Sequence, residues 1–211
     1  MTVVRSTWTT RADGDFAGDL GAGRDVLGAP QPWTWLRQVH GDRVVVVSHP
    51  GEHAGVEADA AVTSTPGCTL AVRTADCAPV VLTGARSVAV LHLGWRGVLA
   101  DLVARTADVM RGLGDEPSVA EVGPCIRPGC YEFDGPELDQ MAARFGDRVR
   151  AVTTAGRPAL DLPAAVTAAL EEQCVTDVRD AAGCTACRPE WFSHRANGDG
   201  QRFATIAWID A

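Results

Sequence analysis

Short apolar runs rich in valine, alanine and threonine dominate the first half of the chain. They are separated by glycine, proline and polar residues, a pattern that favours β-strands over helices. We predict strands at residues 33–39, 44–47, 60–63, 69–72, 79–83 and 87–91, and further strands at 119–122, 175–180 and 203–208. The first thirty residues are rich in glycine and lack any period, so we expect loops around short strands that form a lid or one rim of a cleft.

Helical spacing of apolar residues is found in three later segments. Residues 98–113 place leucine, valine and methionine along one face, which predicts an amphipathic helix. Asp134, with Pro136 in the first turn, predicts a helix that reaches residue 145, and Asp161 is a typical cap for a helix over residues 162–174. The order of elements predicts an α+β fold: a single domain over residues 1–211 with mixed β-sheets flanked by helices, and a metal site at the strand ends.

The charge balance limits the classes of partner. The formal charge is −8, with 27 acidic against 19 basic residues, which argues against nucleic acid and against an anionic membrane surface. There is no run of 18 apolar residues, and the first residues lack the apolar stretch of a secretory signal. We therefore expect a cytoplasmic protein, in which the seven cysteines act as ligands, nucleophiles or packing residues rather than as disulfides.

Three residues with metal-binding side chains stand at the ends of predicted strands: His40, Cys77 and His92. Two imidazoles and one thiol form a three-ligand set with one position open, which is typical of catalytic zinc. The same donors also accept copper. Each residue alone is better explained as a turn histidine or a buried cysteine, so the hypothesis requires that the fold brings them together.

Two cysteine pairs offer a second hypothesis. Cys184 and Cys187 form a CxxC motif, and Cys125 and Cys130 form a CxxxxC motif. Together they would supply four thiolates to a structural zinc ion. A redox role for the CxxC motif is less favoured, because the motif does not open a helix after a strand.

Six segments resemble, in order, motifs of the YfiH-like family, also called the laccase-domain or peptidoglycan-editing-factor family. They are residues 35–41 (WxxQVHG), 58–63 (ADAxVT), 73–80 (TADCxPV), 91–97 (HxGWRG), 123–132 (GPxIxxxCYE) and 192–195 (FSxR). The amino-terminal region departs from the family pattern: residues 9–14 stand where an FxTRxGG-like element is expected, and residues 18–21 replace a longer SLNLG stretch. This region is expected to border the substrate.

The resemblance implies a zinc enzyme whose metal is held by His40, Cys77 and His92. It also implies phosphate-dependent cleavage of adenosine, inosine and methylthioadenosine to the free base and ribose 1-phosphate, together with adenosine deamination. The copper-dependent polyphenol oxidase named for this family is less favoured, because a multicopper cluster needs many histidines and the chain has five. Two alternatives remain: a hydrolase correcting peptidoglycan precursors, with Cys77 activated by His92, and a metal-binding partner protein without turnover.

Further residues acquire roles from this chemistry. Arg11 and Arg96 are candidates to bind phosphate, since guanidinium groups pair with phosphate oxygens in a bidentate manner. Arg96 also precedes a predicted helix, whose amino terminus favours an anion. Asp76 is a candidate to orient a metal-bound histidine or to accept a proton. The expected partners are thus a small nucleoside and phosphate, while the preferred purine and the oligomeric state stay open.

Overall fold

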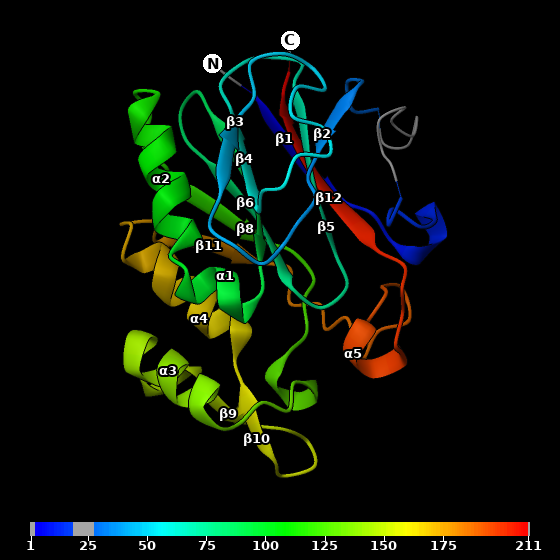
Figure 1. Ribbon diagram of the computed structural model, residues 1–211, viewed down its shortest axis with the longest axis vertical. Helices are drawn as coiled ribbons and strands as arrows, with labels where there is room; N and C mark the ends of the chain where they lie inside the picture. The colour runs from blue at the N-terminus through cyan, green and yellow to red at the C-terminus, as the bar shows by residue number, and fades with distance from the viewer. Residues whose placement is uncertain (1–2, 19–27, 211) are drawn as a thin grey trace.

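Two β-sheets pack face to face, and a layer of helices covers the outer face of the larger sheet (Figure 1). The computed structural model describes residues 3–18 and 28–210. Of the shortened stretch at residues 18–21, all but Gly18 lies outside the described residues. The predicted α+β class and mixed sheets are confirmed.

The smaller sheet has four strands in the order β1-β12-β5-β2. These are β1 (Val4–Trp8), β12 (Phe203–Ile209), β5 (Thr69–Thr74) and β2 (Trp33–Trp35). Strand β12 pairs antiparallel with both β1 and β5, whereas β2 runs parallel to β5. The predicted strand at residues 33–39 therefore ends early, and the chain after Trp35 turns toward the second sheet through a bridge between Arg37 and Glu57.

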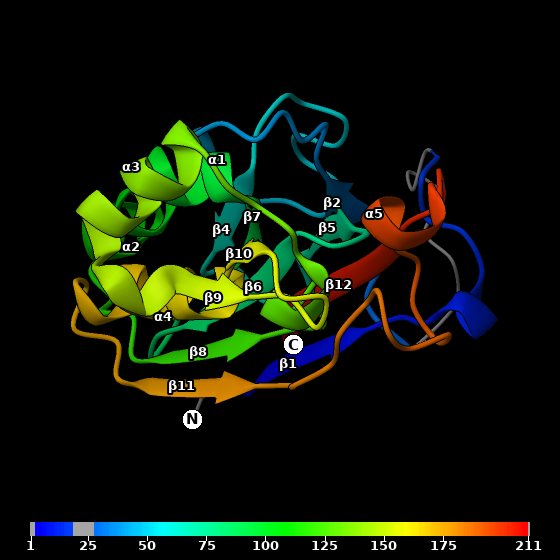
Figure 2. The same ribbon diagram turned by 90° about the horizontal axis from the view of Figure 1, so that it is seen from below.

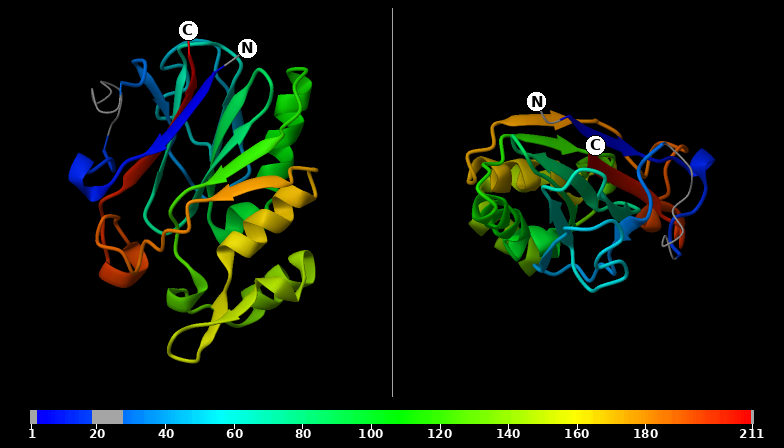
Figure 3. Two further views of the ribbon diagram at one scale, coloured as in Figure 1. Left: turned by 180° about the vertical axis from the view of Figure 1, so that it is seen from behind. Right: turned by 90° about the horizontal axis from the view of Figure 1, so that it is seen from above.

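The larger sheet has six strands in the order β11-β8-β6-β7-β4-β3. These are β11 (Asp177–Asp180), β8 (Val119–Val122), β6 (Ala78–Thr83), β7 (Val88–Leu93), β4 (Ala60–Thr63) and β3 (Val44–Val46). A separate antiparallel pair joins β9 (Arg150–Val152) and β10 (Pro158–Leu160). Figure 3 shows the larger sheet from its β8 and β11 edge, next to β1.

The helices divide between two sides of the molecule. Helices α1 (Trp95–Leu99), α2 (Leu102–Gly112), α3 (Pro136–Phe145) and α4 (Leu162–Glu171) lie together on one side, and α5 (His194–Asn197) lies on the other, near the start of β12 (Figure 2). Three short 3₁₀ turns span Arg11–Asp13, Pro128–Cys130 and Asp147–Val149. No helix among the described residues is long and apolar enough to cross a membrane.

Three details of the predicted helices were wrong. Residues 98–113 form not one helix but α1 and α2, because Asp101 adopts a left-handed conformation with φ 58° between them. Aspartate tolerates this conformation better than most residues, so the break has a local cause. The N-cap of α3 is Gly135 rather than Asp134. Asp161 caps α4 as predicted, accepting a hydrogen bond from the Ala164 backbone at 2.9 Å, but the helix ends at Glu171 rather than at residue 174.

The core explains the apolar runs in the sequence. Alternate residues of β7 face opposite layers: Val88 and Val90 pack between the two sheets, while Leu91 and Leu93 face helices α1 to α4. A central strand buried on both faces reads as a continuous apolar run rather than an alternation. His92 lies on the same face of β7 as Val90, which directs its side chain to the space between the sheets.

Candidate metal centre and its pocket

The structure brings His40, Cys77 and His92 together. His40 lies in the turn after the Arg37 bridge, Cys77 in the turn between β5 and β6, and His92 near the end of β7. Their ligand atoms all lie within 4.8 Å of one another, and Cys77 Sγ is 3.7 Å from His40 Nε2. The two imidazole rings meet edge to face, with centroids 4.7 Å apart. The predicted convergence of the three residues is therefore present.

Asp59, which sequence reasoning did not single out, organises both histidines. Its fully buried carboxylate accepts three successive backbone N–H groups, from Val39, His40 and Gly41, at 3.2, 2.9 and 2.8 Å. A φ of 61° at His40 turns these amides toward one anion. The same carboxylate contacts His92 Nδ1 at 2.8 Å.

This contact leaves Nε2 of His92 available as a ligand atom. A carboxylate that holds the other nitrogen of an imidazole is the usual support of a metal-bound histidine. The donor set thus fits a zinc-type ion. The sequence signal for Asp59 was its place between Ala58 and Ala60, directly before an apolar strand, since a buried charge requires partners.

The thiol and imidazole of this centre have strongly shifted pKa values. Burial would raise the pKa of Cys77, but the charge of His92 and hydrogen bonds with His40 and His92 lower it to about 6. Burial would lower the pKa of His92, but the Cys77 thiolate and Asp59 raise it to about 9. The chain therefore favours a thiolate at Cys77 at neutral pH, which is the form that binds metal.

Gly94 has no side chain, and this leaves room for the side chains of His40 and Cys77. A Cβ atom at this position would lie 2.9 Å from Cδ2 of His40 and 3.1 Å from the sulfur of Cys77. Real Cβ atoms essentially never approach neighbours below 3.0 Å. The glycine of the HxGWRG motif is therefore required by close approach of two ligand side chains.

A pocket of about 630 Å³ opens over the centre. Among the described residues, its lining contains a single carboxylate, that of Asp76. It also contains five arginines: Arg37, Arg73, Arg96, Arg195 and Arg202. Ala17 also lies in the lining, so the amino-terminal region contributes to the rim as expected.

Asp76 does not orient a metal-bound histidine, which corrects one of its two predicted roles. Its carboxylate accepts hydrogen bonds from the hydroxyls of Thr185 and Ser193, both at 2.7 Å, and from the Arg195 backbone at 2.6 Å. Asp59 fills the orienting role instead. Asp76 thereby fixes the carboxy-terminal wall of the pocket beside Cys77.

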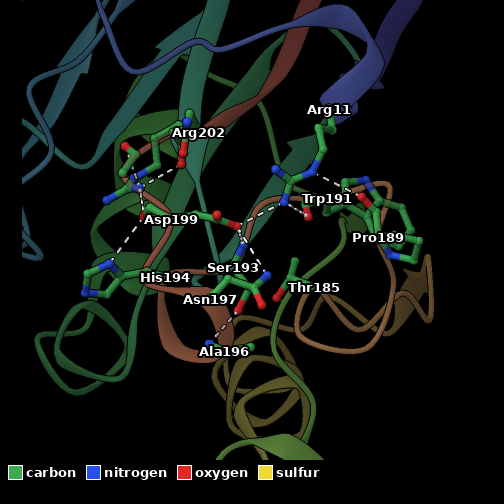
Figure 4. Close-up of polar contacts among 12 residues, drawn as sticks. Arg11, Thr185, Pro189, Trp191, Ser193, His194, Ala196, Asn197, Asp199 and Arg202 are labelled. Carbon is green, nitrogen blue, oxygen red and sulfur yellow. Dashed lines mark hydrogen bonds and ion pairs between the residues drawn. The ribbon is translucent and has the colours of Figure 1, made fainter.

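The two candidate phosphate ligands differ in position. Arg96 lines the pocket and stacks over the Trp95 ring at 4.3 Å, and its guanidinium has no hydrogen bond or ion pair within the described part of the chain. Arg11 lies outside the lining and is already engaged: it pairs with Asp199 at 3.0 Å and donates to the Trp191 carbonyl at 3.1 Å (Figure 4). The geometry therefore supports Arg96 and disfavours Arg11.

The predicted four-thiolate group does not form. Cys130, Cys184 and Cys187 lie together, but Cys125 is not part of this cluster; it is fully buried among apolar side chains on the helical side of the larger sheet. Burial raises the pKa of Cys125 to about 12, which makes it an inert packing residue.

Comparison with known proteins agrees with this architecture. Residues 21–210 match the family described as multi-copper polyphenol oxidoreductase laccase. The chain belongs to this family. It covers most of several relatives: the purine nucleoside phosphorylase of Mycobacterium bovis is 36% identical over 180 residues, 83% of this chain and 72% of that protein. A purine nucleoside phosphorylase of Streptomyces coelicolor is 37% identical over 209 residues, 94% of this chain and 86% of that protein.

Solved structures of the same laccase-type, YfiH-like family share the fold. The protein YfiH of Bacillus licheniformis superimposes with a TM-score of 0.81 at 22% identity, covering 97% of this chain and 92% of that one. A Neisseria meningitidis protein does so with a TM-score of 0.80 at 26% identity, covering 100% of this chain and 99% of that one. The resemblance inferred from the six sequence motifs is thus confirmed.

The family description names several copper ions, and the number of histidines near the pocket shows whether this chain could bind them. All five histidines lie within the described residues, and His49 and His53 are outside the pocket lining. Beside the ligand pair His40 and His92, the lining contains His194, which belongs to α5. This donor set suits one ion rather than a multicopper cluster, which requires many more imidazoles.

Proposed function

We propose that this protein is a zinc-dependent purine nucleoside phosphorylase that cleaves adenosine, inosine or methylthioadenosine to the free base and ribose 1-phosphate. The observation that carries the proposal is the pocket, in which a three-ligand metal centre and five arginines face the same space. The names of the Mycobacterium and Streptomyces relatives support the same activity.

The charge of the pocket supports a small anionic substrate. The chain carries a formal charge of −8, yet cations outnumber carboxylates in the lining. A cationic pocket in an acidic protein concentrates a small anion such as phosphate. The guanidinium of Arg96, which stacks on Trp95 but has no hydrogen bond or ion pair among the described residues, is the best placed to pair with phosphate oxygens. Arg195 is a second candidate, and Asp76 holds its backbone in place.

The metal would be held by His40, Cys77 and His92. A zinc ion bound there supplies Lewis-acid polarisation of an oxygen and lowers the pKa of a water ligand. Asp59 would keep His92 in the tautomer that presents Nε2.

Phosphorolysis forms a bond between a phosphate oxygen and C1′ of the ribose, while the bond from C1′ to the purine nitrogen breaks. The electron pair leaves with the base, which then requires a hydrogen-bond donor or a proton. Burial raises the pKa of Tyr131 in the pocket wall to about 12, so its hydroxyl stays protonated and can donate. The rings of Trp95 and Tyr131 add an aromatic surface suited to a purine. Deamination of adenosine at the same pocket is a second, hydrolytic reaction that we include in the proposal.

One observation favours a different function. Asp59, His92 and Cys77 also form the carboxylate–imidazole–thiol arrangement of a cysteine hydrolase, with the thiol pKa lowered to about 6. Such an enzyme, acting for example on a peptidoglycan precursor, would retain activity after metal removal.

The test is chromatography of adenosine incubated with the zinc-loaded protein, with and without phosphate. Adenine formed only with phosphate supports phosphorolysis, and inosine formed without phosphate supports deamination. Arg96→Ala should raise the KM for phosphate about 10- to 100-fold, the loss of one charged hydrogen-bonding group. Arg11→Ala, which removes an arginine outside the pocket, is the matched control. A zinc-loaded protein that leaves adenosine unchanged under both conditions would exclude the proposal, and hydrolysis of a peptidoglycan precursor that survives a chelator would favour the hydrolase.

A further inference from the structure

A second cluster of thiols lies apart from the pocket centre. Cys130 ends the 3₁₀ turn Pro128–Cys130, and Cys184 and Cys187 lie in a turn more than fifty residues later in the chain. Their three sulfur atoms all lie within 4.8 Å of one another. A parallel bridge between Cys125 and Cys184 fixes this juxtaposition, since it aligns the two segments through their backbones.

Backbone hydrogen bonds fix the CxxC turn. The carbonyl of Cys184 accepts from the N–H groups of Cys187 and Arg188 at 3.2 and 3.1 Å. The N–H of Thr185 donates to the carbonyl of Cys125 at 3.2 Å, which joins the turn to the segment that leads to Cys130.

The other two sulfurs lie close to that of Cys184. The sulfurs of Cys130 and Cys187 lie 2.8 Å apart, longer than the approximately 2.05 Å of a disulfide bond. Three cysteine sulfurs within 4.8 Å of one another are close enough to bind one ion together. A thiophilic cation binds the thiolate form, so its binding would release the thiol protons.

We propose that Cys130, Cys184 and Cys187 bind a thiophilic d¹⁰ cation of the zinc class, as a second metal centre distinct from His40, Cys77 and His92. Three thiolates are a typical part of a structural zinc site, which takes a fourth ligand to complete a tetrahedron. An open pocket of about 520 Å³ beside Cys130, lined also by Glu132 and Asp134, admits a water or a carboxylate to that fourth position.

The position of the cluster suggests its role. Thr185 stands inside the CxxC turn, is almost fully buried, and donates its hydroxyl to Asp76 at 2.7 Å. Asp76 is the neighbour of Cys77 in sequence and also binds the Arg195 backbone. An ion on the three cysteines would fasten the turn that carries Thr185, and thereby the carboxy-terminal wall of the pocket. The second centre is thus a structural support for the first.

Zinc stoichiometry tests this proposal. The full chain is prepared under reducing conditions, loaded with zinc, desalted and weighed by native mass spectrometry. We expect two zinc ions in the wild type, one in Cys187→Ser and in Cys130→Ser, and one in Cys77→Ser. Cys174→Ser is the matched control, since Cys174 is an exposed cysteine outside both clusters and its loss should leave two ions.

Cobalt loading gives an independent measurement. Cobalt-loaded Cys77→Ser should retain the near-ultraviolet absorption of thiolate-to-metal charge transfer, whereas Cys187→Ser should lose most of it. Cys187 is exposed, so this variant should fold, and circular dichroism checks that it does.

Three outcomes would overturn the proposal. One is a wild type with a single zinc that only Cys77→Ser abolishes, which would leave the phosphorylase proposal intact. Another is the binding of two zinc ions by Cys130→Ser and by Cys187→Ser, as in the wild type. The third is a reduced wild type that re-forms a disulfide instead of binding zinc, seen as a mass two daltons lower and five reactive thiols among the seven. A single zinc lost only in Cys187→Ser would instead support the second centre and contradict the first.

Discussion

Replacing Asp59 with asparagine tests whether its carboxylate holds the two histidines of the candidate metal centre in place, in addition to stabilising the fold. One carboxylate oxygen accepts from the His40 backbone and faces His92 Nδ1, and the other accepts from the backbones of Val39 and Gly41. In Asp59→Asn one of these oxygens becomes an NH₂ group. Depending on how the amide turns, its NH₂ faces either the two backbone donors of Val39 and Gly41, or the backbone N–H of His40 together with Nδ1 of His92.

The loss of stability in Asp59→Asn follows from these contacts. Two hydrogen bonds to a charged acceptor are lost, at about 1.5–3 kcal/mol each, so the free energy of unfolding should fall by about 3–6 kcal/mol. If the NH₂ faces His92, the imidazole must carry its proton on Nε2 and no longer offers that atom to a metal. If it faces Val39 and Gly41, the turn that holds His40 opens. Loss of such a supporting carboxylate typically weakens metal binding 10- to 100-fold.

Asp115→Asn is the matched control. Asp115 is also buried, and its carboxylate accepts from the backbones of Ala85, Arg86 and Ser87 and from the Ser87 hydroxyl. It lies at the opposite end of β6 and β7 from the metal centre. Zinc affinity is measured by competition with a chromophoric chelator, and stability by urea unfolding. Equal zinc affinity in Asp59→Asn and wild type, or an equal loss in Asp115→Asn, would refute the assigned role of Asp59.

Two further predictions concern close packing and pH. Gly94→Ala should weaken zinc binding at least about tenfold and lower stability by about 1–3 kcal/mol, because the new Cβ overlaps His40 and Cys77. Gly112→Ala, at the end of α2 with open space around it, should leave zinc binding unchanged and should not lower stability. Intact zinc binding in Gly94→Ala would contradict the packing argument. Burial would raise the pKa of Asp115, but hydrogen bonds from Ser87 and its neighbours lower it below 3.8. The ionised Asp115 carboxylate therefore stabilises the fold fully above pH 3.8, and this stabilisation is lost as the pH falls through the lowered pKa. The urea midpoints of wild type and Asp115→Asn should accordingly converge in acid. A difference that stays constant with pH would refute this.

The sequence predicted the elements that local pattern controls. Strands β4 and β8 were found at their correct bounds, because central strands read as apolar runs and short loops separate them. The break at Asp101 was missed, since amphipathic spacing continues across it. The three candidate metal ligands were found because they stand beside strand ends in recognisable motifs.

Residues that depend on distant parts of the chain could not be predicted in the same way. The partner of Arg11 is Asp199, 188 positions away, and no local pattern announces this pairing. The cysteine cluster has the same origin: Cys187 meets Cys130 across 57 positions, whereas Cys125, which is nearer to Cys130 in sequence, points into the core. Asp59 was missed because its role depends on amides that only the folded turn at His40 brings together.

The order of strands in the smaller sheet has a consequence for how the protein is made. Strand β12 follows every other strand of the chain, yet it lies in the interior of its sheet, between β1 and β5. A ribosome therefore releases β1 and the paired strands β2 and β5 long before the strand that joins β1 to β5 exists. The pocket wall that Asp76 holds also comes from residues just before β12. Metal loading and substrate binding should accordingly begin only after synthesis has passed β12, and nascent chains stalled before it should depend on chaperones to shield the unpaired strand edges.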